Sequence, residues 1–282
     1  MFSGGRSVRS RGRRGGFFPE IGQRSSMTVV TDLRDREPIV GTWLTLSDPA
    51  VAEASARLEF DIAVIDREHT ALSLETVTEM ARAIDAAGTD TEALVRVSEN
   101  DPTEIKRVLD AGVAGVMAPM IDTAEQAREL VAATRYPPEG VRGVGIARGT
   151  GYGDTLSDAV ANANDEVATI AQIETRDGLA NVEEIAAVDG LDALFVGPAD
   201  LSAALGNFGE FEDEAFREAV DRVLEAGHAV DKPVATIALE QADVQRWLER
   251  GFDAVVAGVD VDYVLSGGRD AKNAFEEAVE PR

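Results

Sequence analysis

The chain has 282 residues, of which 44% are hydrophobic, and a net charge of −25. Its length suits a single α/β barrel, and its acidic excess argues against a nucleic-acid-binding protein, because such a protein must neutralise phosphates with basic residues. It contains no cysteine, which excludes disulfides and thiolate metal sites and favours the cytoplasm, and no apolar run approaches the roughly 18 residues that a membrane span needs.

Residues 1–26 differ in composition from the rest of the chain. They contain six arginines and one acidic residue and are rich in Gly and Ser, so the remainder carries a net charge of −30. Such a stretch cannot bury enough apolar surface to fold alone, and it lacks the apolar core of a signal peptide. We therefore expect a disordered basic tail or, since Met27 follows directly, a misassigned start, with the folded domain spanning 27–282.

Acidic residues are spread over predicted helices such as 123–134 and 209–227, whereas the chain has only three lysines, Lys106, Lys232 and Lys272. A surface of this kind suits concentrated salt, because screening by ions removes the repulsion between like charges. The composition therefore predicts a halophilic protein with a solvated acidic surface and not an acidic interaction tail.

Short apolar strands alternate with amphipathic helical stretches from residue 38 onward. The predicted strands are 38–46, 61–66, 92–97, 115–121, 167–175, 192–198, 233–239 and 254–260. The predicted helices are 48–58, 73–87, 102–111, 123–134, 176–187, 212–227, 240–250 and 262–278. This eightfold alternation predicts a single-domain (β/α)8 TIM barrel. A doubly wound open sheet is the alternative, but no GxGxxG motif follows the first strand.

One predicted connection is much longer than the others. It is residues 135–166, with the sequence RYPPEGVRGVGIARGTGYGDTLSDAVANANDE. A long insertion in a compact barrel is usually functional, although a packed surface loop or a contact between subunits is the alternative. Its glycines match neither a P-loop nor a dinucleotide-binding fingerprint, and residues 155–165 are compatible with a short helix.

Polar residues gather where the predicted strands end. In a (β/α)8 barrel the carboxyl ends of all strands lie on one rim, and this rim carries the chemistry. Four strands deliver polar or small residues to it: Asp66, Arg67, Glu68 and His69 after the second, Arg96 on the third, Gln172 and Glu174 on the fifth, and Gly197, Pro198, Ala199 and Asp200 after the sixth. Because alternate strand residues share a face, Gln172 and Glu174 point the same way.

Glu174 and Asp200 come from adjacent strands and offer hard oxygen ligands. Two carboxylates, with waters and a chelating substrate, suit Mg²⁺ or Mn²⁺, with Co²⁺ or Zn²⁺ as alternatives. Each residue also has a simpler interpretation: Glu174 as part of a solvated strand end, and Asp200 as the N-cap of the helix that follows. Capping is compatible with metal binding, and the free N–H groups at that helix start would suit a substrate carboxylate.

His69 is one of two histidines in the chain. A lone histidine is more often structural than catalytic, but Asp66 lies three residues earlier and would orient and charge its ring as a general base. Arg96 has two interpretations, a buried ion-pair partner or a cation that stabilises a developing enolate. His228 belongs to the opposite rim, where we expect no chemical role.

Five segments of the chain match a known protein family in the same order. They are VIDREH, LVRVSENDPTEIKRVLDAGVAGVMAPMIDTAEQA, PPEGVRGVG, AQIET and LFVGPADLSAALG, and they span about residues 39–265. Together they resemble the HpcH/HpaI aldolase family, also called the aldolase/citrate lyase family of metal-dependent barrel enzymes. The combination of IET and GPADLS at this separation carries the resemblance, because VRGVG alone is a weak signal.

This resemblance implies a class II, metal-dependent 2-oxo acid aldolase. A 2-oxo acid such as pyruvate would chelate a divalent metal held by Glu174 and Asp200, and the metal would act as a Lewis acid that promotes loss of a C3 proton. The resulting enolate would attack an aldehyde, and retro-aldol cleavage is the reverse. The other roles implied are proton transfer by His69 with Asp66, enolate stabilisation by Arg96, and substrate binding by Gln172, Gly197 and Ala199. The family also implies a homo-oligomer, namely a hexamer.

Two departures from the family pattern lie next to His69. Arg67 stands where Gly or another small residue is frequent, and TALS follows the histidine where a Pro-containing turn is common. Neither change touches the expected metal ligands. Both leave the choice of aldehyde open.

Three other functions are alternatives to a metal-dependent aldolase. A CoA-ester lyase of the malyl or citryl type would share the fold and the metal ligands, but the short chain and the VRGVG loop favour an aldolase of free acids. A Schiff-base aldolase needs a lysine at the carboxyl end of a strand, and none of the three lysines is predicted there. A non-catalytic barrel is the third alternative, since the fold alone does not establish catalysis.

We predict that the protein becomes more stable as salt increases, because a folded domain with a net charge of −30 repels itself when it is not screened. The melting temperature, followed by circular dichroism, should rise between low and molar KCl. A melting temperature that stays flat or falls over this range would contradict the prediction.

Overall fold

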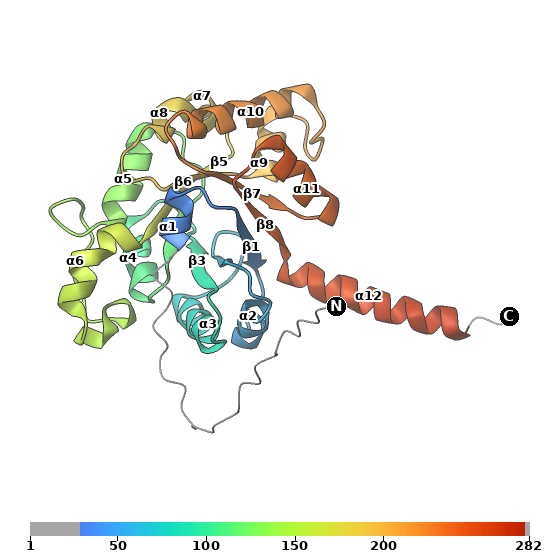
Figure 1. Cartoon of the computed structure of the whole chain (residues 1–282), viewed down its shortest axis with the longest axis horizontal. Helices are drawn as coiled ribbons and strands as arrows, with labels where there is room; N and C mark the ends of the chain where they lie inside the picture. The colour runs from blue at the N-terminus through green and yellow to red at the C-terminus, as the bar shows by residue number, and fades with distance from the viewer. Residues whose placement is uncertain (1–28, 280–282) are drawn as a thin grey trace, which may run out of the picture.

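Eight parallel strands close into a barrel in the computed structural model, which describes residues 29–279 (Figure 1). Each strand pairs with the next along the chain, and the last pairs with the first. The strands are β1 Ile39–Leu44, β2 Ile62–Asp66, β3 Glu92–Arg96, β4 Gly115–Ala118, β5 Ala168–Ile173, β6 Ala193–Val196, β7 Val234–Ala238 and β8 Ala254–Val259. The predicted (β/α)8 fold is confirmed. The expected tail over 1–26 lies outside the described residues.

Helices surround the barrel and join its strands. They are α1 Val29–Arg34, α2 Pro49–Ala56, α3 Leu74–Ala86, α4 Pro102–Asp110, α5 Ala124–Thr134, α6 Leu156–Glu166, α7 Arg176–Ala180, α8 Val182–Ala186, α9 Pro198–Leu205, α10 Glu214–His228, α11 Gln241–Arg250 and α12 Asp260–Val279. A 3-10 helix, η1, covers Arg148–Gly153. The structure differs from the predicted helices in three places. The single helix expected over 176–187 is broken at Asn181, α1 was not predicted, and the helix expected to follow Asp200 is α9, which begins earlier, at Pro198.

The strands separate two apolar layers. Alternate residues of each strand face the barrel interior, where Trp43, Val64, Leu94 and Phe195 are buried. The other face packs against the helices, whose apolar stripes supply the larger core. This division fixes which residues reach the interior of the rim, because a shift of one residue would turn a side chain to the other face.

Helix α1 closes the amino end of the barrel, since Val29, Val30 and Leu33 pack with the interior residues. Two ion pairs hold the segment in place. Arg34 contacts Asp192 at 3.0 Å, and Arg36 contacts Asp253 at 2.7 Å. Both aspartates directly precede a strand, so acidic side chains at the amino end of the barrel hold helix α1 in place there.

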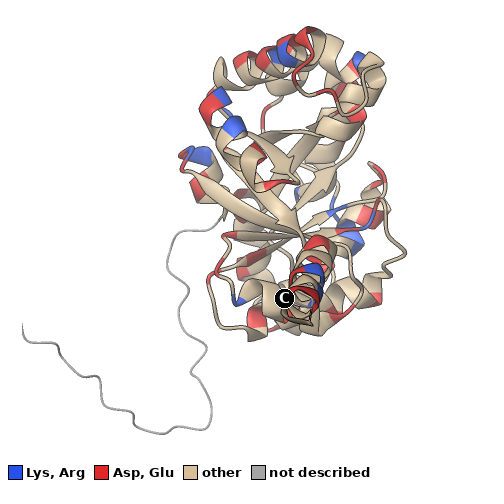
Figure 2. Cartoon of the chain, turned by 90° about the vertical axis from the view of Figure 1, so that its right-hand side faces the viewer, with Lys and Arg blue, Asp and Glu red and all other residues tan. Residues whose placement is uncertain are grey.

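Acidic residues are found mainly in the surrounding helices and loops, and the barrel strands carry few charged residues (Figure 2). This distribution keeps like charges apart and in contact with water, where repulsion is weakest. Within residues 29–279 no helix combines the length and apolar character required to cross a bilayer.

Candidate active site

The inward positions of β2 and β3 bring Asp66 and Arg96 together at the carboxyl rim. Along β2 the interior residues Ile62 and Val64 are followed, two residues later, by Asp66. The register pairs Asp66 directly with Arg96, the last residue of β3. Each of these two strands therefore places apolar side chains inside the barrel and a charged side chain at its carboxyl end.

Arg96 is buried and surrounded by oxygen atoms and an aromatic ring. Its Nε and Nη2 donate to the two carboxylate oxygens of Asp66 at 2.9 and 2.7 Å, and its Nη1 lies 2.8 Å from Glu68 Oε2. The guanidinium carbon is 4.7 Å from the centroid of the Trp43 ring. Burial raises the pKa of Asp66, but the hydrogen bonds and charge of Arg96 outweigh it and hold that pKa below its usual range.

The structure does not support the expected pairing of Asp66 with the His69 ring. The Asp66 carboxylate is occupied by Arg96 and by the backbone N–H groups of Glu68 and His69, at 3.0 and 3.4 Å. The His69 side chain is 63% exposed, and its Nε2 lies 3.8 Å from Glu68 Oε2. Asp66 therefore positions the arginine and the turn after β2, and the carboxylate nearest to the imidazole is that of Glu68.

Glu174 is a buried carboxyl group with few compensating contacts. Its Oε1 accepts a hydrogen bond from the Met120 N–H at 2.8 Å, and Gln172 Nε2 donates to its Oε2. Burial raises its pKa to about 7, and the charges of Glu68 and Asp200 act in the same direction. The interpretation of Gln172 and Glu174 as a solvated strand end is therefore wrong, because both side chains are buried.

The backbone of Met120 adopts a φ of 50°, in the left-handed region that non-glycine residues rarely occupy. This conformation directs its N–H at Glu174, although the Met120 side chain is largely exposed. Strain of this kind persists where the surrounding structure requires it, and here it accompanies a hydrogen bond to a candidate metal ligand. Nothing in the sequence around Met120 indicates the conformation.

Because Gly197 has no side chain, the side chains of Glu174 and Gln172 can lie against its backbone. A Cβ atom at this position would lie 2.7 Å from Glu174 Oε2 and 2.8 Å from Gln172 Nε2. Gln172 Oε1 is buried without a hydrogen-bond partner among the described residues, so an acceptor remains available for a ligand. The glycine is thus required by close approach of side chains, which explains its place in the GPADLS segment.

Asp200 lies in the first turn of α9 and not at its N-cap. The cap position is Gly197, Pro198 is the first helical residue, and no side chain caps the helix. The expected capping role of Asp200 is therefore wrong, and its exposed carboxylate is not engaged in holding the helix start. The Ala199 N–H makes no hydrogen bond among the described residues, which leaves a donor facing the rim.

A pocket of about 250 Å³ brings the predicted residues together. Seven of the eight candidates line it, namely Asp66, His69, Arg96, Gln172, Gly197, Ala199 and Asp200. Glu174 is not part of this lining, but it accepts a hydrogen bond from Gln172, which is. Trp43 and Thr45 of the β1 end also line the pocket and were not predicted. The candidate set from four separate strands therefore forms one site.

The carboxylates of the rim fit a divalent cation. Burial raises the pKa of Glu68, and the charges of Asp66 and Asp200 raise it further while that of Arg96 opposes them. One buried arginine does not neutralise this set, so a hard cation would find oxygen ligands of high charge. Within residues 29–279 no cluster of three His, Cys, Asp or Glu side chains has metal-ligand geometry.

The amino rim holds the residues for which no chemistry was expected. Lys232 donates to the carbonyl oxygens of Ala186 and Val188, and burial lowers its pKa. His228 Nε2 lies 2.8 Å from Asp253 Oδ2, just before β8. Neither residue faces the pocket, so the lysine cannot form an imine with a substrate bound there.

Comparisons with known proteins identify relatives of the chain. The sequence profile of the HpcH/HpaI aldolase/citrate lyase family matches residues 40–266. A relative named hydroxypyruvate/pyruvate aldolase, from Delftia acidovorans, is 39% identical over 81% of this chain and 85% of its own length. A relative named 5-keto-4-deoxy-D-glucarate aldolase, from Klebsiella pneumoniae, is 37% identical over 84% of this chain and 92% of its own.

A solved structure shows the same fold. The HpcH/HpaI aldolase/citrate lyase family protein from Burkholderia cenocepacia J2315 superposes with a TM-score of 0.85 and is 37% identical. The match covers 88% of this chain and 98% of that one. The whole barrel, and not a single motif, is therefore shared.

Glu174 should make the metal-free protein less stable as the pH rises from about 4.5 to about 7. In this window the folded protein, with a pKa of about 7, retains a proton that the unfolded chain has lost, so the free energy of unfolding falls with pH. The loss should be on the order of 3 kcal/mol and should be absent from Glu174→Gln.

Urea unfolding in EDTA at several pH values measures this difference. Glu79→Gln, which changes an exposed glutamate of α3, serves as the matched control and should follow the wild type. A difference in stability between wild type and Glu174→Gln that does not vary with pH would contradict the prediction.

Proposed function

Because the chain belongs to the HpcH/HpaI aldolase/citrate lyase family, we propose that it is a metal-dependent aldolase that reversibly cleaves 4-hydroxy-2-oxo acids. The products are pyruvate, or a related 2-oxo acid, and an aldehyde. The observation that carries this proposal is the buried Glu174 carboxyl, with its pKa raised to about 7, beside Asp200 and Arg96. The relatives reported above are named as aldolases, which favours this activity over that of a CoA-ester lyase or a non-catalytic barrel.

Glu174 and Asp200 are the residues that would hold the divalent metal, for which Mg²⁺ or Mn²⁺ fits an oxygen ligand set best. Bound there, the metal would act as a Lewis acid on the keto oxygen of the 2-oxo acid. The buried carboxyl of Glu174 gives up its proton more readily when a cation compensates its charge. The Met120 N–H and the Gln172 amide fix its orientation.

Arg96 would bind the oxygen on which negative charge develops. Two of its five N–H groups donate to Asp66, and Nη1 forms an ion pair with Glu68, so N–H groups of the guanidinium remain for substrate. Its position is set by two carboxylates and by Trp43, which lets it act without reorganisation during the reaction. The ion pair with Asp66 thus sets the orientation of the Arg96 guanidinium.

His69 would transfer the proton. In the cleavage direction a base accepts the proton of the 4-hydroxyl, the C3–C4 bond breaks, and its electron pair remains with the 2-oxo acid fragment as the enolate. Protonation at C3 then gives the free 2-oxo acid. The imidazole lies on the pocket lining beside Glu68, and its exposed position allows exchange of protons with water.

The start of α9 would orient the substrate. The Ala199 N–H is free to donate to the carboxylate of the 2-oxo acid, and Gly197 leaves room for close approach. Gln172 Oε1 would accept a hydrogen bond from the substrate or from a bound water. These contacts fix the 2-oxo acid half, which all substrates of the proposed reaction share.

The proposal includes a homo-oligomer, with a hexamer as the expected form, working in a salty cytoplasm. Helix α12 supports association, because it extends away from the barrel (Figure 1). Apart from Asp260, its residues are not buried within this chain, and Val264, Leu265, Phe275 and Val279 are exposed apolar side chains on it. A 20-residue helix with such side chains gains most of its stability from packing, so a second copy is the natural partner.

Glu174→Gln should lower the turnover of a 4-hydroxy-2-oxo acid by roughly 10³-fold while leaving the far-ultraviolet circular dichroism unchanged. The substitution keeps the shape of the side chain and removes the charge that would bind the metal. EDTA should have the same effect on the wild type, and Mg²⁺ or Mn²⁺ should restore only the wild type. Release of pyruvate from a panel of 4-hydroxy-2-oxo acids provides the measurement.

The matched control is again Glu79→Gln, an exposed glutamate far from the rim, which should retain full activity. Near-normal, EDTA-resistant turnover in Glu174→Gln would overturn the metal-dependent mechanism.

Light scattering after size-exclusion chromatography should give a mass several times the chain mass of 30.0 kDa, and six times that mass for the expected hexamer. The double substitution Leu265→Glu with Phe275→Glu should reduce the mass, because it places charge on the apolar residues of α12. The exposed Asp270→Asn is the control and should not change it. A wild-type protein of one chain mass would contradict the oligomer.

A further inference from the structure

Two hydrogen bonds join the end of β5 to the loop between β4 and α5. The Met120 N–H donates to Glu174 Oε1 at 2.8 Å, and the hydroxyl of the next residue, Thr175, donates to Asp122 Oδ1. The first bond holds the candidate metal ligand. Because the second bond begins at the adjacent residue, it ties the same two segments together beside the first.

The Thr175 hydroxyl has two separate functions. As the N-cap of α7 its oxygen accepts a hydrogen bond from the Gly178 N–H at 2.9 Å, and its single proton goes to Asp122. Capping therefore uses the hydroxyl as an acceptor, whereas the contact with Asp122 uses it as a donor. Serine would keep both functions, and valine, which has nearly the same shape, would remove both.

Asp122 is held through its backbone as well as its side chain. Its N–H donates to Gln126 Oε1 at 2.8 Å, and its carbonyl oxygen accepts from Asn181 Nδ2 at 2.7 Å. Asn181 is the residue at which α7 and α8 separate. The loop is therefore fixed both from α5 and from the segment that follows β5.

The two residues before Asp122 have little freedom to move. The Ile121 N–H donates to the Gln172 carbonyl oxygen at 3.2 Å, and a Cβ atom on Gly178 would lie 2.7 Å from the Ile121 carbonyl oxygen. Met120 adopts its φ of 50° although its side chain is 55% exposed, so packing of that side chain does not impose the conformation. The contacts on Ile121 and Asp122 are the ones that hold it.

We propose that Thr175 and Asp122 are positioning residues for the metal ligand Glu174. Their hydrogen bond holds the β4–α5 loop so that the Met120 N–H remains on Glu174 Oε1. Neither side chain lines the pocket of the candidate active site, so both act through Met120 and Glu174. The inference rests on the proposed function, because it takes Glu174 as a ligand of the metal.

Mn²⁺ binding to the full-length protein without substrate tests the proposal, with free Mn²⁺ measured by electron paramagnetic resonance. Thr175→Val and Asp122→Ala should each weaken Mn²⁺ binding about tenfold, as is usual when a group that orients a metal ligand is lost. Thr175→Ser should bind Mn²⁺ as the wild type does. Asp122→Ala leaves the cap of α7 in place, so its effect reports the contact between the two segments alone.

Two further variants separate the hydrogen bond from other effects of Asp122. Asp122→Asn removes the negative charge but keeps an oxygen that accepts from Thr175, so Mn²⁺ affinity should be retained. The double substitution Thr175→Val with Asp122→Ala should bind Mn²⁺ no more weakly than either single variant, because each of them already breaks the one shared bond.

Substitutions of Met120 test the backbone conformation through which the pair acts. Glycine adopts a positive φ without strain, so Met120→Gly should keep the N–H in place and retain Mn²⁺ affinity. Met120→Val should weaken Mn²⁺ binding about tenfold, because a β-branched residue disfavours this region. Since the Met120 side chain is largely exposed, lost packing does not account for such a difference.

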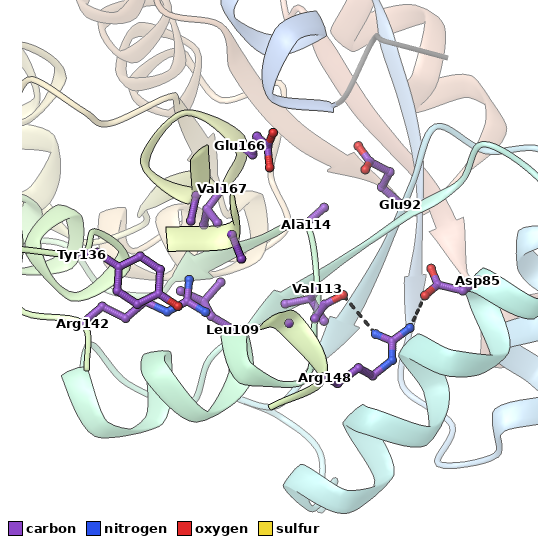
Figure 3. Close-up of a pocket in the computed structure, with 14 residues that line it drawn as sticks. Asp85, Glu92, Leu109, Val113, Ala114, Tyr136, Arg142, Arg148, Glu166 and Val167 are labelled. Carbon is purple, nitrogen blue, oxygen red and sulfur yellow. Dashed lines mark hydrogen bonds and ion pairs between the residues drawn. The ribbon is translucent and has the colours of Figure 1, made fainter. Parts of the chain in front are cut away.

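Two control variants lose comparable contacts elsewhere. Asp213→Ala removes the N-cap of α10, and Arg148→Gln breaks the ion pair with Asp85 that holds the long insertion against α3 at the amino end of the barrel (Figure 3). Both should lower the melting temperature and leave Mn²⁺ affinity unchanged. A merely structural role of Thr175 and Asp122 would give the same result as these controls.

Three results would overturn the inference: wild-type Mn²⁺ affinity in Thr175→Val and Asp122→Ala, equal losses in Asp122→Asn and Asp122→Ala, or losses that add in the double variant. If Glu174→Gln weakens Mn²⁺ binding and the Thr175 and Asp122 variants do not, this inference alone fails. A wild-type protein that binds no Mn²⁺, or Glu174→Gln with wild-type affinity, would overturn the proposed function together with it.

Discussion

A single buried arginine organises the carboxyl rim of this barrel. Arg96 binds both oxygens of Asp66 across the β2–β3 pair and also contacts Glu68. Removing either partner of such a buried pair leaves an uncompensated charge, which is costly. Yet one positive charge does not balance the carboxylates around it, and the charges of Glu68 and Asp200 add to burial in raising the pKa of Glu174. The rim thus retains an excess of negative charge, which we propose a divalent cation offsets.

The parts of the site that follow from local periodicity were predictable from the sequence. The alternation of β5 places Gln172 and Glu174 on the interior face, and the eight strand–helix units bring the rim residues together. The pairing of Asp66 with Arg96 instead of His69 depends on the register between two strands, which no local pattern specifies. Proximity along the chain suggested the wrong partner.

Helix starts and short helices were also difficult to predict. Pro198 begins α9 two residues before Asp200, so a residue that resembles an N-cap lies inside the first turn. Helix α1 has only six residues. Its position depends on packing against the barrel interior and on ion pairs with Asp192 and Asp253, both distant in sequence. The left-handed backbone of Met120 is likewise imposed by its surroundings.

The central claim is that the rim containing Arg96 and Glu174 removes a proton from C3 of a 2-oxo acid with the help of a divalent cation. Proton nuclear magnetic resonance of pyruvate in D₂O tests this step without knowledge of the aldehyde. The account predicts that wild-type protein with Mg²⁺ causes loss of the methyl signal through deuterium exchange, and that EDTA or Glu174→Gln stops it. Exchange at the same rate in EDTA and in Glu174→Gln would contradict the account.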